Sequence, residues 1–334
     1  MKSATPRLPD WRRRIDGAQL TRTPDRYLEK DWISMMEQQE AASRSAASRL
    51  AVGIVSAGRV GSIVGAALQR AGHRIVAATA VSEASRERAE RHFPDAEILP
   101  PPDVAAAAEL VVIAVPDDAI APLVAALPVR PGQIWIHTSG ANGVGVLAPA
   151  REAGALTAAL APAMTFTGRP EDLERLDGIS WAVTGEADAG YIGEALVLEM
   201  GGEPEHIPEA DRARYHAALV YSANHLITLV NDTVDQLRDM GVAAPERLLS
   251  PLVSASLDNA LRHGDAGLTG PVSRGDAGTV AGHLRALEGT DIADAYRAMA
   301  RRTAERALDS GRLRTGDAEG LLEVLAHPKE ETPE

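Results

Sequence analysis

Two closely spaced glycines after a predicted strand give the clearest indication of chemistry in this sequence. Residues 53–61 read Gly-Ile-Val-Ser-Ala-Gly-Arg-Val-Gly, between an apolar run and an amphipathic helical pattern. Gly58 would let the backbone approach a pyrophosphate, and Gly61 would let the helix pack closely on the strand. The first amides of such a helix favour phosphate groups. We therefore expect a dinucleotide to bind at Ser56, Ala57, Gly58, Arg59, Val60 and Gly61.

Ser56 stands where the pattern G-x-G-x-x-G has its first glycine. A serine can make this turn if its φ angle stays negative, so the serine weakens the match to the pattern without breaking it. The alternative, a turn with only a structural role, stays open.

The end of the second predicted strand, 74–78, indicates which dinucleotide would bind. An acidic residue there would normally hold the adenosine ribose of NAD, but none of residues 79–82 is acidic. The residues that could instead bind a 2′-phosphate are Ser82, Ser85, Arg86 and Arg88, with Ser82 and Arg86 preferred. NADP(H) is therefore favoured over NAD(H). Glu83 is the counter-argument, and the arginines could also form a solvated helix face.

Two further strand ends should lie near the same ligand. Ligands of a parallel sheet bind at the carboxyl ends of its strands. We therefore expect Val115 and Pro116, after the strand 110–115, and Ser139, after the strand 133–137, to line the nicotinamide. His137 is equally consistent with a hydrogen-bonded core histidine.

A long helix, 211–240, carries the candidate proton donor. The only lysines are Lys2, Lys30 and Lys329, so the chemistry between them must proceed without an ammonium group. His216 is the candidate general acid, with a structural role as the alternative, and Asn224 lies on the same polar stripe. The residues around this stripe are largely apolar, which predicts a central, buried helix. His216 and His225 face opposite ways, so no metal site is expected.

The elements that position these residues predict an α/β protein in which a doubly wound parallel sheet precedes an all-α C-terminal domain. The predicted strands are 50–55, 74–78, 110–115, 133–137, 156–160, 179–184 and 203–207, and the later helices are 211–240, 245–263, 277–288 and 291–310. Three regions result: an N-terminal extension (1–49), a dinucleotide-binding domain (50–208) and a helical domain (209–328). The extension is either poorly ordered or a docking helix around Trp32.

Composition excludes several classes of function. The 334 residues include no cysteine and carry a formal net charge of −13. Disulfides, thiolate catalysis and cysteine-bound metals are therefore ruled out, and nucleic acid is an unfavourable partner. No apolar run approaches the ~20 residues that a transmembrane helix needs. We expect a soluble, cytoplasmic protein that does not associate with membranes.

Several segments together resemble a known family over about residues 50–310. They are Ser56–Gly61, His137–Gly140, Pro162–Phe166, Tyr215-His216 with Ser222 and Asn224, and Thr269–Asp276 followed by Thr279, Val280, His283 and Leu284. The chain is similar to Rossmann-like proteins with a C-terminal domain of unknown function, DUF2520. That family in turn resembles pyrroline-5-carboxylate reductases, and more distantly ketopantoate and 3-hydroxyacid dehydrogenases.

The resemblance implies an NADP(H)-dependent oxidoreductase with a helical domain for substrate binding and dimerisation. The expected reaction is hydride transfer to a small imine or keto acid, in a homodimer, with Thr165 and Arg274 as candidate substrate-binding residues. Arg274 could hold an anionic group. The family has His-Pro where this chain has Ala161-Pro162. If that histidine is catalytic in relatives, a non-catalytic dinucleotide-binding or sensing protein is the alternative function.

Overall fold

The computed structural model describes residues 49–186 and 188–326. The predicted N-terminal extension lies outside these residues, apart from Arg49. The chain divides into two compact units, with the boundary between Ala218 and Leu219. This boundary lies further along the chain than the predicted one at 208/209, because the segment from Glu209 to His216 contacts the first unit.

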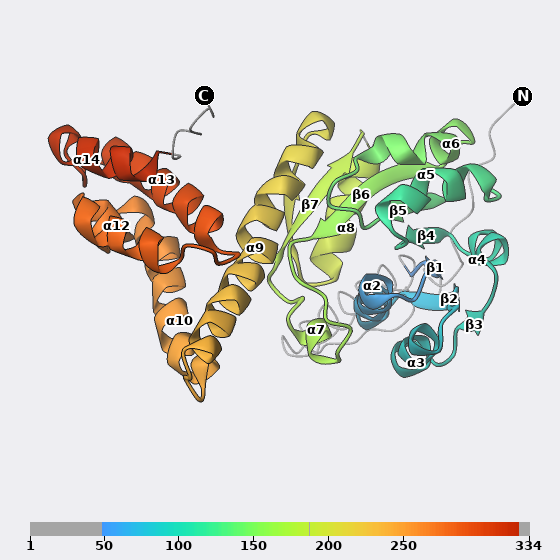
Figure 1. Cartoon of the computed structure of the whole chain (residues 1–334). Helices are drawn as coiled ribbons and strands as arrows, with labels where there is room; N and C mark the ends of the chain where they lie inside the picture. Colours follow the sequence, from blue (N-terminus) through green and yellow to red (C-terminus); the bar gives the residue numbers. More distant parts are fainter. Residues whose placement is uncertain (1–48, 187, 327–334) are drawn as a thin grey trace, which may run out of the picture. The chain divides into compact units, whose positions relative to one another are not determined.

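The first unit contains one eight-stranded sheet in the order β3-β2-β1-β4-β5-β6-β7-β8 (Figure 1). Its strands are β1 Ala51–Val55, β2 Arg74–Ala78, β3 Glu97–Ile98, β4 Leu110–Ile113, β5 Ile134–His137, β6 Leu156–Pro162, β7 Ser180–Gly185 and β8 Glu203–His206. The chain reverses its direction of travel across the sheet between β1 and β4. In doubly wound sheets this is the point where ligands bind.

Helices cover both faces of this sheet. They are α2 Arg59–Arg70, α3 Glu83–His92, α4 Pro101–Ala107, α5 Asp117–Ala126, α6 Ala148–Glu152, α7 Glu171–Glu174 and α8 Asp188–Glu199. Ile54 of β1 packs in one apolar cluster with Ile63 of α2, and Val55 packs in a second cluster with Val104 of α4. Alternate residues of one strand thus face opposite layers. The predicted doubly wound α/β architecture is confirmed.

Two strands, β7 and β8, depart from the predicted parallel arrangement and run opposite to the other six. β7 runs antiparallel to β6, whereas every other neighbouring pair is parallel. A parallel return needs a crossover connection, usually a helix long enough to cross the sheet. Between β6 and β7 the helix is α7, with only 4 residues, so the chain turns back directly. The α8 crossover then makes β7 and β8 parallel.

The second unit is helical, as predicted. Its helices are the later part of α9 Arg212–Asp239, α10 Pro245–His263, α11 Pro271–Arg274, α12 Ala277–Ala286, α13 Ala293–Asp309 and α14 Thr315–Leu325. Val280, Ala304 and Leu321 belong to an apolar cluster that joins α12, α13 and α14. Among the described helices, none is both long and apolar enough to span a membrane.

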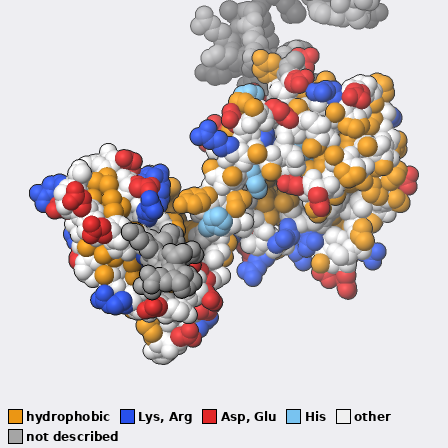
Figure 2. All heavy atoms as spheres, turned by 45° about the horizontal axis from the view of Figure 1, so that its top comes forward, with side chains coloured by type: hydrophobic (Ala, Val, Ile, Leu, Met, Phe, Trp, Pro, Cys, Tyr) orange, Lys and Arg blue, Asp and Glu red, His pale blue; other side chains and the backbone are white. Residues whose placement is uncertain are grey.

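The prediction that residues 211–240 form a buried helix is wrong for the single chain. Within the second unit, Ile227 and Leu229 of α9 are more than half exposed, as are Leu252 and Leu261 of α10. The apolar residues of α12–α14 bury one another instead. Hydrophobic side chains accordingly reach the surface between charged ones (Figure 2).

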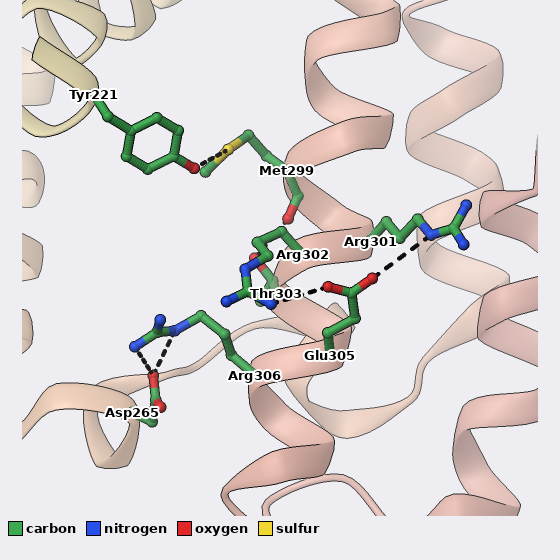
Figure 3. Close-up of polar contacts among 8 residues, drawn as sticks. All are labelled: Tyr221, Asp265, Met299, Arg301, Arg302, Thr303, Glu305 and Arg306. Carbon is green, nitrogen blue, oxygen red and sulfur yellow. Dashed lines mark hydrogen bonds and ion pairs between the residues drawn. The ribbon is translucent and has the colours of Figure 1, made fainter. Parts of the chain in front are cut away.

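Polar contacts in the second unit connect α13 to neighbouring elements (Figure 3). The Tyr221 hydroxyl of α9 lies 3.7 Å from the Met299 sulfur of α13. Arg306 of α13 pairs with Asp265, its Nε donating over 2.7 Å. These groups are substantially exposed, and exposed ion pairs contribute little to stability. The apolar cluster of α12–α14 is therefore the main source of stability for this part of the unit.

Candidate dinucleotide site

The turn between β1 and α2 has the backbone geometry of a glycine-rich turn, although it begins with serine. Ser56 has φ +81°, so the serine makes this turn with a positive φ and the condition of a negative φ is not met. Serine adopts this left-handed conformation only at a cost of roughly 1–2 kcal/mol. Such strain persists where the surrounding structure fixes it, and it concentrates at functional sites. The turn thus keeps the shape that the missing glycine would favour.

Gly61 is required by close packing at this turn. A Cβ atom at Gly61 would lie 2.1 Å from the Ser56 carbonyl oxygen and 2.9 Å from Cβ of Ala114. A Cβ at Gly58 would meet only the Ser56 hydroxyl, at 3.4 Å. The predicted role of Gly61 in helix–strand packing therefore agrees with the geometry. Gly58 leaves the backbone open at the start of α2, where first-turn amides have no intrahelical acceptors.

Two arginines lie beside this turn. Arg88 of α3 donates from Nε to the Ala57 carbonyl over 3.3 Å. A Cβ at Gly168, in the β6–β7 connection, would lie 3.0 Å from Cγ of Arg59 and 3.8 Å from a terminal nitrogen of Arg88. The start of α2 is therefore flanked by two guanidinium-bearing side chains. This is a favourable setting for phosphate groups.

The residues predicted for a 2′-phosphate differ in availability. Ser82 is exposed and caps α3, accepting from the Ser85 amide over 3.2 Å. Ser85 is buried, and its hydroxyl donates to the Ser82 carbonyl over 2.7 Å. Arg86 is exposed and lines a surface hollow with Phe93 and Ile98. Arg88, by contrast, contacts the turn itself.

The ends of β4 and β5 lie at the same sheet edge as the turn, because β1, β4 and β5 are parallel neighbours. Val115 is half-buried and Pro116 is the exposed residue before α5. Ser139 is buried, and its hydroxyl accepts from the Asn142 amide over 3.0 Å. The structure thus brings Val115, Pro116 and Ser139 to the edge where the sequence predicts them.

His137 is a core histidine with both ring nitrogens hydrogen-bonded. Nε2 lies 2.9 Å from the Gly143 carbonyl, and Nδ1 lies 3.2 Å from the Ser139 amide, which can only donate. Nε2 therefore carries the proton of a neutral ring. Burial lowers the pKa of His137 to about 4, although the bond to Gly143 acts in the opposite direction.

The first turns of α9 contact the loop after β5. A Cβ at Gly140 would lie 2.4 Å from Nδ1 of His216, so the imidazole lies directly against this loop. Arg212 is buried and donates from Nε to the Asn142 carbonyl over 3.0 Å. Burial raises the pKa of the neighbouring Tyr215, which the Arg212 charge partly opposes.

The sequence reading missed Arg212 and Glu209 because an arginine and a glutamate at a helix start are ordinary solvent-facing residues in a single sequence. The sequence feature that could have indicated this contact is the pair of glycines in the loop after β5. Gly140 and Gly143 each leave room for a side chain of the segment 209–216.

The β6–β7 connection carries Thr165, which is exposed. Further along it, the buried Asp172 accepts from the amides of Thr167 and Gly168, over 2.7 and 2.8 Å. Burial alone would raise the pKa of Asp172, but these hydrogen bonds outweigh it and hold the pKa below its usual value. Asp172 thereby fixes the loop whose Gly168 contacts Arg59.

The remaining candidates belong to other parts of the chain. Asn224 and Arg274 are exposed residues of the second unit. Asp276 caps α12, accepting from the Thr279 amide over 3.0 Å. The predicted strand 156–160 ends before Ala161, but the observed strand extends past this residue. Ala161 lies inside β6, opposite Ala182, and is only 4% exposed.

No group of three or more metal-ligating side chains occurs in residues 49–186 and 188–326. Burial and hydrogen bonds to the backbone explain the presence of His137 in the core. The residues of α9 that contact the loop after β5 include His216 and Arg212. The described part of the site therefore offers guanidinium groups, free first-turn amides and an imidazole.

Fold and turn together define a Rossmann-like architecture, and comparison with known families gives the same class. A Rossmann-like domain matches residues 36–162, and DUF2520, a domain of unknown function, matches residues 179–303. The chain belongs to the proteins that combine these two domains. No curated protein matches the chain in sequence.

Solved structures share this architecture at low sequence identity. Protein BF3122 from Bacteroides fragilis is 20% identical, with a TM-score of 0.65, covering 77% of this chain and 98% of its own. A reductive aminase from Aspergillus terreus, in complex with NADPH and ethyl levulinate, is 19% identical with a TM-score of 0.54, covering 79% and 95%. The 1-pyrroline-5-carboxylate reductase from Streptococcus pyogenes is 18% identical with a TM-score of 0.54, covering 78% and 99%. At these identities the likeness establishes the fold.

Proposed function

We propose that this protein is an NADP(H)-dependent oxidoreductase that reduces a small imine or keto acid by hydride transfer. The observation that carries the proposal is the turn at Ser56–Gly61. It keeps a strained, glycine-like backbone at Ser56 and a position where only glycine fits at Gly61. Helix N-termini are favourable sites for phosphate groups, and backbone strain concentrates at functional sites, so both features support a binding role for this turn.

The preference for NADP(H) rests on the surroundings of this turn. β2 ends without a carboxylate that could bind the adenosine ribose. Ser82, Arg86 and Arg88 are the candidates for the 2′-phosphate, and Arg88 already lies against the Ala57 carbonyl. The NADPH complex of the fungal reductive aminase, a protein of the same fold, supports this assignment.

The proposed substrate class follows from the groups available near the ends of β4 and β5. When bound, NADPH supplies a hydride to the electrophilic carbon of the substrate. His216, beside Gly140, is the candidate donor of the accompanying proton. All three lysines of the chain lie outside the described residues. An imine suits this arrangement because a proton from His216 to its nitrogen would give an iminium, whose carbon accepts the hydride, and the fold relatives include a reductase of a cyclic imine.

The exposed apolar faces of α9 and α10 support a homodimer built on the second unit. Leu252 and Leu261 of α10 are 60% and 80% exposed. A groove of about 480 Å³ between the two helices is lined by Val234, Leu249 and Val253, among others. Exposed apolar surface that is contiguous over two helices is typical of an interface with another protein chain. We propose a second copy of the chain as the occupant.

A substrate panel tests the proposed reaction. NADPH oxidation is followed over small cyclic imines and keto acids, in wild type and in His216→Asn. We expect turnover of at least one compound, reduced by about 10²–10⁴-fold in the variant while NADPH still binds. Tight NADPH binding without turnover of any compound would favour the dinucleotide-sensing alternative. Full turnover by His216→Asn would remove His216 from the reaction.

A further inference from the structure

Arg212 is a buried cation that forms no direct ion pair with any described carboxylate. It is 1% exposed, and no carboxylate of the described chain lies within ion-pair distance of it. Burial lowers the pKa of its guanidinium. A buried charge is normally tolerated only when it is paired or fully hydrogen-bonded. The burial of Arg212 therefore has to be explained by its hydrogen-bond partners.

The partners of Arg212 are carbonyl oxygens from separate segments. Nε donates to Asn142 over 3.0 Å, Nη1 donates to Ala182 of β7 over 3.2 Å, and Nη2 donates to Ser139. Only a guanidinium presents several donors in one rigid plane. Arg212 thus joins the loop after β5 to a strand elsewhere in the same sheet.

Glu209 holds the far end of the same loop. Its carboxylate accepts from the amides of Val144, over 2.7 Å, and Gly145, over 3.1 Å. A Cβ at Gly143 would lie 1.9 Å from the Glu209 carboxylate, so glycine is required there. The loop is therefore bound through its amides by a carboxylate and through its carbonyls by a guanidinium.

Three residues of the connecting segment face this loop at helical spacing. Glu209, Arg212 and His216 are three and then four positions apart, which places them on one side of a helical segment. His216 lies against Gly140, between the loop positions whose carbonyls Arg212 binds. The position of the candidate proton donor and that of Ser139 are thus fixed by the same contacts.

We propose that Arg212 is the positioning residue of the reaction site: it fixes the loop 139–142, and through it the relative positions of Ser139 and His216. This inference rests on the proposed function of that sheet edge. If Arg212 had only a structural role, substituting it would change the stability of the protein and nothing else. A positioning arginine affects the chemical step while leaving the dinucleotide turn intact, because Arg212 contacts neither Ser56 nor Gly61.

The test compares Arg212→Lys with wild type and with Arg214→Lys, a control at an exposed position of the same helix. One ammonium cannot reach three carbonyls in the geometry of the guanidinium. We expect Arg212→Lys to fold and to lower kcat by about 10²-fold, the scale of an ångström-sized misplacement. The Kd for NADPH should stay within about threefold, since the loss is in positioning rather than in cofactor binding.

Hydrogen exchange of the Val144 and Gly145 amides gives a readout that does not depend on any reaction. We expect these amides to exchange faster in Arg212→Lys and in Glu209→Gln, and unchanged in Arg214→Lys. Wild-type kcat in a folded Arg212→Lys would overturn the proposal, as would unchanged amide exchange. If wild type turns over no substrate, the proposed function fails, and amide exchange alone decides whether Arg212 fixes the loop.

Discussion

The neutral, buried His137 makes the stability of the first unit depend on pH. Its pKa of about 4 in the folded chain lies below the ordinary value of 6.5. A lowered pKa means that protonation favours the unfolded state, so this contribution to stability is present above pH 6.5 and is lost as the pH falls toward 4. At about pH 4.5 the unfolded histidine is almost fully protonated, whereas the folded one is about one quarter protonated.

The size of the effect follows from these protonation states. With 1.36 kcal/mol per pKa unit, the free energy of unfolding should fall by roughly 2–3 kcal/mol between about pH 7.5 and 4.5 through His137 alone. The carboxylates also titrate in this range, so the measured quantity is the difference between wild type and His137→Gln. Urea unfolding is followed by tryptophan fluorescence, to which the buried Trp135, two positions away in the same strand, contributes.

His137→Gln should be less stable than wild type at neutral pH and should show a flatter pH profile. His92→Gln is the control, because burial lowers the pKa of His92 as well, but that residue is only half-buried and lies on α3. An unchanged pH profile in His137→Gln would refute the assignment of His137 as a neutral histidine in the folded chain.

Three further predictions concern packing and assembly. Gly61→Ala should lower NADPH affinity by at least about tenfold, since its Cβ would lie 2.1 Å from a backbone oxygen. Gly58→Ala should remain stably folded, because its Cβ would meet only the Ser56 hydroxyl at 3.4 Å. Equal stability and equal NADPH affinity in the two variants would contradict this prediction. Ala161→His should lower the free energy of unfolding by about 1–3 kcal/mol through overpacking, and a stable variant with higher turnover would show instead that the position is catalytic. Light scattering should give twice the chain mass of 35.2 kDa, and Leu252→Glu should reduce it to the monomer while Leu198→Glu, on α8, should not; a monomeric wild type would contradict the proposed dimer.

Periodicity was sufficient to predict the first part of the fold. The apolar stripe of α2 and the runs of β1, β2, β4 and β5 appear close to their predicted bounds. The strand β3 has only 2 residues, both exposed, so it carries no hydrophobic pattern. The direction of β7 depends on the length of the preceding connection, which no periodicity within the strand encodes.

The site was predictable where chemistry depends on residue type, and not where it depends on tertiary contact. Gly61 could be identified from its spacing, but the φ of Ser56 is imposed by the surrounding chain. The exposure of α9 could not be predicted because an apolar helix pattern does not tell which surface covers it. Arg212 likewise acquires its partners only when α9 meets the loop after β5.

A binding titration tests the central claim, that the β1–α2 turn of this chain binds NADP(H). Calorimetric titration of wild type with NADPH and with NADH is compared with the same titrations of Arg88→Ala and Arg86→Ala. We expect NADPH to bind more tightly than NADH, and the preference to narrow when a 2′-phosphate partner is removed, most strongly in Arg88→Ala because Arg88 contacts the turn. Absence of binding by either dinucleotide would contradict the account of the turn, and equal affinities in wild type would contradict the assignment to NADP(H).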